Sequence, residues 1–350
     1  MAKFFKKLLF GGRLLKTGIS VFITALICYA FDFSAIFAVI TAIVTIEPTA
    51  SDSIKKGFIR FPASVIGAGI SMFIASFLGE TALSFALSTM LTIYICHKLK
   101  LDAGIVVATI TGAVMIPTTD AHFFTAFITR IATTSIGIIV STIVNILILP
   151  PKFSPLISES ITRINENTSK LFELLQKQLY EYKLEIKKEQ DDLYKRVSEL
   201  IEKTNQLCNY QRDEFKYHRQ SQMDIRKFHC ALKQLHILQL IAFHLGNLKY
   251  LDYSSISFSK DEKEMLIRTI TSLRQILQHP NHLITQEHYR LIESMDVIFR
   301  HHHENEKEKT PSKYHHHFSP QTIILYELLS IHDALEELEQ VSVKCERQHS

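Results

Sequence analysis

The stretch IEPTASDSIKKGFIRFPASVIGAGI, residues Ile46 to Ile70, interrupts the most apolar part of the chain with charged residues and prolines. It places Glu47 and Arg60 where an apolar helix would otherwise continue. A second stretch, IPTTDAHFFTAFITRIATTSIGII, residues Ile116 to Ile139, repeats the pattern. In each, a Pro-Thr pair ends an apolar run, and a later arginine is followed by six residues and then a glycine. The repetition indicates two related halves of one domain.

The 350-residue chain has two parts of different amino-acid composition. Residues 1–150 are rich in Ile, Ala, Phe, Val, Thr and Gly, whereas residues 151–350 carry most of the Lys, Glu, Gln, His and Tyr. This distribution predicts a membrane domain followed by a soluble domain. The net charge of +4 averages the two parts and gives no indication of a nucleic-acid partner. The five cysteines show no regular spacing, which favours reduced thiols in a cytosolic compartment.

We predict an all-α protein with six transmembrane helices. A spanning helix needs about 20 residues, and the second, fourth and fifth candidates are shorter than that. The candidate spans are 14–31, 33–48, 58–79, 82–96, 102–117 and 123–149. Residues 1–13 have a basic face and a Phe/Leu face, which predicts an amphipathic helix lying on the membrane surface. The predicted domains are therefore 1–13, the six-helix membrane domain 14–153, and a helical bundle over 154–350.

The basic residues predict the orientation of these spans. They precede span one and occur between spans two and three, between spans four and five, and after span six: Lys3, Lys6, Lys7, Arg13, Lys16, Lys55, Lys56, Arg60, Lys98, Lys100 and Lys152. The alternate loops contain no lysine or arginine unless Arg130 is counted with the last of them. The positive-inside rule then places both termini in the cytoplasm. We expect a multi-pass protein of the plasma membrane.

Three spans per half make the second half cross in the opposite sense to the first, which predicts an inverted 3+3 repeat of the kind found in secondary transporters. Span two ends at Pro48 and span five at Pro117, so the two short, proline-terminated spans correspond. Such broken helices free backbone groups to hold a ligand. Pro48 and Pro117 are therefore candidate residues of a binding site.

Four ionisable residues complete the candidate site. Arg60 and Arg130 occupy equivalent places in the two halves. An arginine inside a membrane is energetically costly, so its presence there suggests a function. Each can instead be an interfacial anchor whose long side chain reaches the headgroups. Glu47, directly before the break, can pair with Arg60 or carry a proton, or be solvated at the membrane end. Asp120 is its weaker counterpart, and a solvated loop residue is the simpler interpretation.

The chain resembles a known family at these residues. The run AIFAVITAIVTIEPT, the two R-x6-G patterns and the closing LPP are similar to the membrane domain of the aromatic acid exporter (fusaric acid resistance) superfamily, in its compact Gram-positive form. The resemblance covers residues 14–153. It implies an inner-membrane exporter of organic, often aromatic, acids and a homo-oligomer, with one six-span block and a helical cytoplasmic tail. The resemblance does not identify ligand-binding residues in this sequence.

The second part of the chain has the periodicity of long helices, predicted at 156–186, 190–219, 224–250, 260–278, 285–303 and 321–343. No nucleotide-binding glycine motif is found, so ATP-driven transport is unsupported and no cofactor is predicted. No catalytic constellation indicates an enzyme. Two histidine triplets, His301–His303 and His315–His317, flank a charged segment. They are open to three interpretations: a solvated loop, adventitious metal binding, or a metal sensor.

We expect a proton-coupled secondary exporter of small organic acids that contacts membrane lipids and binds the anion through Arg60 and Arg130. The alternative is a membrane-anchored scaffold or sensor whose cytoplasmic helical domain binds a protein partner. A channel is also conceivable, but no charged ring or carbonyl-rich filter motif supports it. The sequence does not identify the substrate, the coupling ion or the number of subunits.

Overall fold

The computed structural model describes residues 2–118, 123–148, 151–180, 183–218, 221–251, 253, 256–309 and 318–347. Contacts divide the chain into two compact units, Met1–Lys152 with Tyr210–Arg219, and Phe153–Asn209 with Gln220–Ser350. Every regular element in the described residues is helical and none is a strand. The prediction of an all-α protein is therefore confirmed for this part of the chain.

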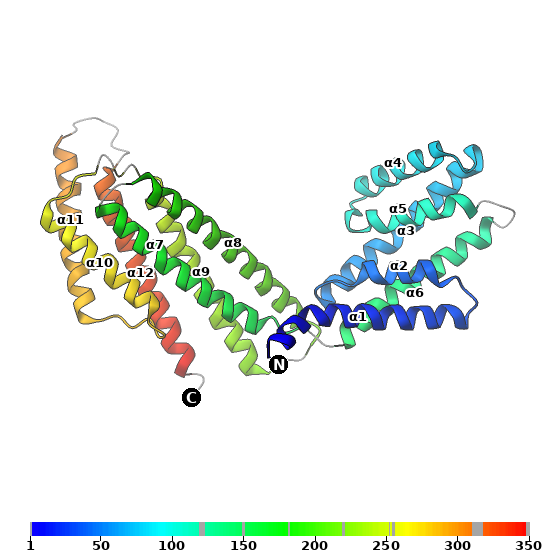
Figure 1. The fold of residues 1–350 in the computed structure, drawn as a ribbon, viewed down its shortest axis with the longest axis horizontal. Helices are drawn as coiled ribbons and strands as arrows, with labels where there is room; N and C mark the ends of the chain where they lie inside the picture. The colour runs from blue at the N-terminus through cyan, green and yellow to red at the C-terminus, as the bar shows by residue number, and fades with distance from the viewer. Residues whose placement is uncertain are drawn as a thin grey trace. The chain divides into compact units, whose positions relative to one another are not determined.

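The first unit is built from apolar helices joined by short segments (Figure 1). These are α1 (Ala2–Ala30), α2 (Ala35–Thr45), α3 (Ala50–Leu78), α4 (Ala82–Lys98), α5 (Ile105–Met115) and α6 (Phe123–Leu147). Within α1, α3 and α6, the segments Gly12–Ala30, Ala50–Leu78 and Phe124–Leu147 are long and apolar enough to cross a membrane. The helices α2 and α5 are shorter, so the count of six spans stays a prediction. Helix α1 runs without a break past the boundary predicted at residue 13.

The break between α2 and α3 follows from the local sequence. The residue before a proline is pushed toward extended backbone, so Pro48 prevents α2 from continuing through Glu47. Thr49 then caps α3 by accepting a hydrogen bond from the Asp52 backbone N–H at 3.1 Å. Because of this cap, α3 starts at Ala50 rather than at the predicted residue 58.

The break after α5 is milder than the one after α2. A 3-10 helix, Ile116–Thr118, continues α5 directly, and Pro117 lies within it. A second 3-10 helix, Asp102–Gly104, precedes α5. The two prolines predicted as equivalent therefore occupy different local structures: Pro48 is in a non-helical segment, and Pro117 is in a tight helical turn.

The first unit has two halves, α1–α3 and α4–α6, and the short helix of each half packs on a long helix of the other half. Helix α2 packs on α6, and α5 packs on α3. The glycine of each R-x6-G pattern lies at these contacts: a Cβ at Gly67 would overlap the Ala108 carbonyl oxygen of α5, and one at Gly137 would overlap the Ala38 carbonyl oxygen of α2. Small residues allow membrane helices to approach this closely. Equivalent glycines thus make equivalent contacts with the opposite half.

The second unit is a bundle of long helices (Figure 1). They are α7 (Ser154–Tyr180), α8 (Leu184–Glu214), α9 (Gln222–Lys249), α10 (Lys260–Gln278), α11 (Gln286–Lys309) and α12 (Pro320–Arg347), and the last turn of α8 belongs to the first unit. Helix α9 packs on α7 and α12, while α10 packs on α7 and α11. Leucines and isoleucines at helical spacing, such as Leu238 and Ile241, are fully buried between them. Ser259 and Glu262 form a capping box at the start of α10, since each side chain bonds the backbone N–H of the other.

The cysteine prediction requires a correction. The expectation of reduced thiols is wrong for Cys230 and Cys345, which form a disulfide between α9 and α12 with their Cα atoms 6.2 Å apart. These residues are 115 positions apart in the sequence, and only the packing of α9 on α12 brings them together. Cys28, Cys96 and Cys208 are buried and are not part of a disulfide.

Candidate functional site

A carboxylate–cation cluster occupies the break between α2 and α3. Glu47 accepts hydrogen bonds through both carboxylate oxygens, from Arg60 Nη2 at 2.5 Å and from Lys56 Nζ at 2.8 Å. Arg60 Nε also donates to the Ala103 carbonyl oxygen at 3.2 Å, just before α5. The Glu47 and Arg60 side chains are only 11% and 9% exposed, so the pair is largely shielded from solvent. Arg60 therefore points into the protein.

A second polar cluster lies beside the first, and the sequence analysis missed it. Lys16 of α1 donates from Nζ to Asn145 Oδ1 of α6 at 2.8 Å. The Asn145 amide donates to the Glu47 and Thr49 carbonyl oxygens at 3.0 and 3.1 Å, and to Ser53 Oγ at 2.7 Å. Asn145 is thus a bridge between α1, α6 and the α2–α3 break. A lone asparagine in the apolar run that ends at Leu147 was the available signal, since such residues join membrane helices.

The last turn of α8 completes this end of the first unit. Glu214 is buried, and its Oε1 accepts a hydrogen bond from the Ala50 backbone N–H at 2.8 Å, at the start of α3. Its Oε2 pairs with His218 Nδ1 at 2.8 Å, and His218 Nε2 lies 2.9 Å from the Ile146 carbonyl oxygen. A carboxylate at a helix N-terminus is favoured by the helix dipole. This contact could not be predicted, because Glu214 lies far from α3 in the sequence.

Arg130 lies on α6, apart from these clusters. It is 4% exposed, and its guanidinium carbon lies 3.7 Å from the centroid of the Phe37 ring of α2, a cation–π contact. Its Nε and Nη1 have no hydrogen-bond partner among the described residues. Between described residues, no hydrogen bond or ion pair joins Arg130 to Glu47 or Arg60. Arg130 is therefore buried, and two of its three guanidinium nitrogens are unpaired within the described part of the chain.

The remaining predicted residues are placed as follows. Pro48 and Pro117 are both exposed and have no N–H to donate, so they shape the breaks rather than contact a ligand. Asp120 lies outside the described residues, as does the triplet His315–His317. The triplet His301–His303 lies on α11, where His302 Nε2 is 2.9 Å from Glu262 Oε1.

An apolar groove runs between α3 and α6. Its volume is about 440 Å³, and it is lined by Ile54, Gly57, Phe58, Phe61, Ser135, Ile138, Ile139, Thr142 and Ile143. Phe58 is 79% exposed, so the groove opens at the surface of the unit. Its lining can accommodate a hydrophobic ring or an acyl chain.

Apolar helices of membrane length that bury arginines and a carboxylate are typical of one class of protein, the helical membrane transporters. Comparison with known proteins agrees, because residues 8–148 match aromatic acid exporter family member 1. A UPF0421 protein of Bacillus cereus is 48% identical over 96% of this chain and 94% of its own length. UPF0421 proteins of Halalkalibacterium halodurans and Staphylococcus aureus are 37% and 34% identical, over 94% and 77% of this chain and 89% and 83% of their own lengths. The chain belongs to the family of UPF0421 proteins, and its residues 8–148 match the aromatic acid exporter family model. The resemblance seen in the sequence is confirmed.

Proposed function

We propose that this chain exports small organic acids, including aromatic ones, across the bacterial plasma membrane, and that Arg130 binds the carboxylate of the substrate. The observation that carries the proposal is the buried guanidinium of Arg130, whose Nε and Nη1 lack partners among the described residues. Leaving such donors unmet in a membrane protein is costly. A carboxylate satisfies them and neutralises the charge. The Phe37 ring beneath the guanidinium offers an aromatic substrate a stacking surface.

Arg60 is the second anion-binding group in this proposal, and Glu47 controls it. With Glu47 ionised, its carboxylate occupies Arg60 Nη2 at 2.5 Å. Protonation of Glu47 removes the charge that holds Arg60 and leaves the guanidinium available to a substrate carboxylate. The Glu47 carboxylate and the substrate carboxylate thus compete for Arg60, so protonation of Glu47 and binding of the substrate are coupled through one ion pair. The apolar groove that contains Phe61, the neighbour of Arg60, takes the hydrophobic part of the substrate.

Six spans with both termini in the cytoplasm are part of the same proposal. The exchanged packing of α2 on α6 and of α5 on α3 supports two oppositely oriented halves. The matching contacts of Gly67 and Gly137 support it further, because each uses the same position of the R-x6-G pattern. Arg60 and Arg130 then lie toward opposite sides of the membrane, one near each exit of the transport path. We also propose a homo-oligomer, as the family resemblance implies.

The experiment is uptake of radiolabelled benzoate, with butyrate as an aliphatic comparison, into proteoliposomes that contain the purified chain and a pH gradient. Arg130→Ala is expected to reduce the initial rate by about tenfold or more, the loss typical of one charge-assisted contact to substrate. Arg130→Lys should restore part of it. Arg163→Ala is the matched control, since Arg163 lies on the exposed face of α7 paired with Glu159. Equal initial uptake rates for wild type and Arg130→Ala would contradict the assignment of Arg130 as the residue that binds the substrate carboxylate. No uptake of any acid by the wild-type chain would instead favour the scaffold alternative.

A further inference from the structure

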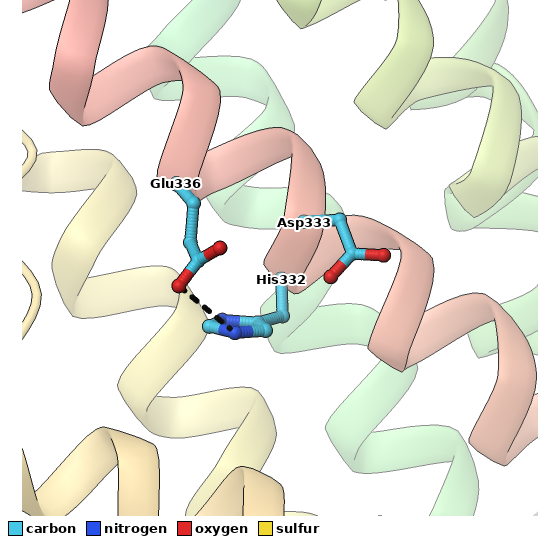
Figure 2. A group of neighbouring side chains, drawn as sticks. All are labelled: His332, Asp333 and Glu336. Atoms are coloured by element: carbon cyan, nitrogen blue, oxygen red, sulfur yellow. Dashed lines mark ion pairs between the residues drawn. The ribbon is translucent and has the colours of Figure 1, made fainter.

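Helix α12 of the second unit carries three adjacent side chains that can bind a metal ion. One ligand atom each from His332, Asp333 and Glu336 lies within 4.8 Å of the other two. Figure 2 shows the two carboxylates on either side of the His332 imidazole ring. This cluster is separate from the candidate transport site, and the sequence analysis did not identify it.

The imidazole of His332 is fixed in position by its neighbours. The residue is 6% exposed, and its Nδ1 lies 3.1 Å from Nε2 of His288, which is fully buried on α11. His288 Nδ1 in turn lies 2.8 Å from Ser272 Oγ on α10. The ring of Tyr289 packs perpendicular to that of His332, with the centroids 5.8 Å apart. Its Nδ1 therefore faces the protein, and its Nε2 faces the Glu336 carboxylate.

The distance from His332 Nε2 to Glu336 Oε1 is 3.5 Å, which is long for a charge-assisted hydrogen bond. The network through His288 and Ser272 accommodates the tautomer in which His332 Nδ1 carries the proton. In that tautomer Nε2 carries a lone pair on the side of the Glu336 carboxylate, and Asp333 belongs to the same cluster of ligand atoms. Two ligands of one zinc ion, with metal bonds of about 2.0–2.2 Å, lie about 3–3.5 Å apart.

We propose that His332 Nε2, Asp333 and Glu336 bind a divalent first-row transition-metal ion. An imidazole nitrogen favours zinc, iron or nickel over magnesium and calcium, and the carboxylates extend the range to manganese. Asp333 is exposed, so the ion can enter from solvent, and water can complete its coordination. The ring of Tyr289 packs against the imidazole of His332, and His288 contacts its Nδ1, so both neighbours hold the imidazole in place.

The test measures zinc bound to the full-length chain, purified without a histidine tag, treated with chelator and dialysed against Zn²⁺. Wild type is expected to bind one more zinc ion than His332→Gln or Glu336→Gln, and the affinity for that ion should fall by about tenfold or more in either variant. The histidine triplets are present in all these proteins, so their contribution cancels. Glu337→Gln is the matched control, because Glu337 is an exposed carboxylate on the same helix outside the cluster.

Thermal unfolding provides a second measurement and detects misfolded variants. Zn²⁺ is expected to raise the Tm of wild type and of Glu337→Gln but not of Glu336→Gln, because a ligand stabilises only the folded state that binds it. Equal zinc content in wild type and Glu336→Gln, or an equal Tm increase in both, would overturn the proposal. Displacement of the zinc by an equal concentration of Ca²⁺ would overturn the assigned class of metal. Since neither measurement involves transport, failure here leaves the proposed export function untouched.

Discussion

Glu47 Oε1 lies 2.5 Å from Arg60 Nη2, so a carboxylate just after α2 holds a guanidinium on α3 across the break between the two helices. The pair is largely buried and is shared with Lys56. Removing one member of a buried ion pair is far more damaging than the pair is stabilising, because the partner stays buried without its counter-charge. This asymmetry makes the cluster testable.

Glu47→Gln is expected to destabilise the protein by roughly 3 kcal/mol, because Arg60 loses its counter-charge while staying buried. It should also abolish the dependence of benzoate uptake on the pH gradient, since the substituted amide side chain does not take up a proton. Thermal unfolding and proteoliposome uptake measure the two effects. Glu80→Gln serves as the control, because Glu80 is exposed just after the end of α3. Gradient-driven uptake by Glu47→Gln at the wild-type rate would exclude Glu47 as the coupling group.

Gly67→Ala and Gly137→Ala are each expected to destabilise the first unit, because the added methyl overlaps the carbonyl oxygen of Ala108 or Ala38. Overpacking of this kind typically costs about 1–3 kcal/mol. Gly69→Ala is the matched comparison: Gly69 lies on the same helix as Gly67 and has open space around it, so the substitution should be neutral or stabilising by up to about 1 kcal/mol. Thermal unfolding in detergent measures the difference. Similar Tm values for Gly67→Ala and Gly69→Ala would contradict the close α3–α5 packing.

Asn145→Leu is expected to lower the stability by about 1–3 kcal/mol, because it leaves Lys16 buried without its 2.8 Å partner. Replacing Lys16 as well, in Lys16→Met/Asn145→Leu, should recover part of the loss, since both polar groups are then absent. A double-mutant cycle by thermal unfolding measures the coupling. Additive effects of the two substitutions would show that the bond is energetically unimportant.

The stability of the second unit should decrease on acidification because of His282. Burial lowers the pKa of this histidine below 6.5, although its Nδ1 contacts the Ile276 carbonyl oxygen at 3.1 Å; His279 nearby also lowers it. A lowered folded-state pKa means that the unfolded chain binds the proton more tightly. The contribution of neutral His282 to the stability of the folded second unit is therefore complete above about pH 6.5 and is lost as the pH falls below that value.

His282→Asn tests this contribution, because asparagine tolerates the positive φ of 54° at this position and does not titrate. The decrease in Tm between about pH 7.5 and about pH 5.5, a range that spans the ordinary histidine pKa, should be smaller in the variant than in wild type. His229→Asn, at a surface histidine of α9, is the control. An identical pH dependence for wild type and His282→Asn would refute the role of His282.

Cys230 and Cys345 should form an intramolecular crosslink when the purified chain is oxidised, because their Cα separation of 6.2 Å suits a disulfide. Mass spectrometry of tryptic peptides, with and without reductant, detects the joined peptides. Cys345→Ser should remove the crosslink, and its persistence would mean that Cys230 has another partner.

Short-range patterns explain what the sequence predicted well. Hydropathy and helical periodicity depend on neighbouring residues, so the helical class, the two-part composition and the starts of α10 and α11 could be predicted. The start of α3 was placed less well, because a polar run such as SDSIKKG can be either a loop or a capped first turn. The start predicted for α5 falls instead in the 3-10 helix Asp102–Gly104. Glu47 and Arg60 could be paired in advance because both flank one break.

The sequence by itself determined an all-helical chain with an apolar first part, a break at Pro48 and a repeated R-x6-G pattern. The tertiary structure alone decided that Lys16 meets Asn145, that Glu214 caps α3, that Cys230 meets Cys345 and that His288 orients His332. The physical reason is that each of these contacts depends on how a helix is rotated about its axis and which distant helix it faces. Those quantities are set by packing over the whole unit and leave no trace in local sequence.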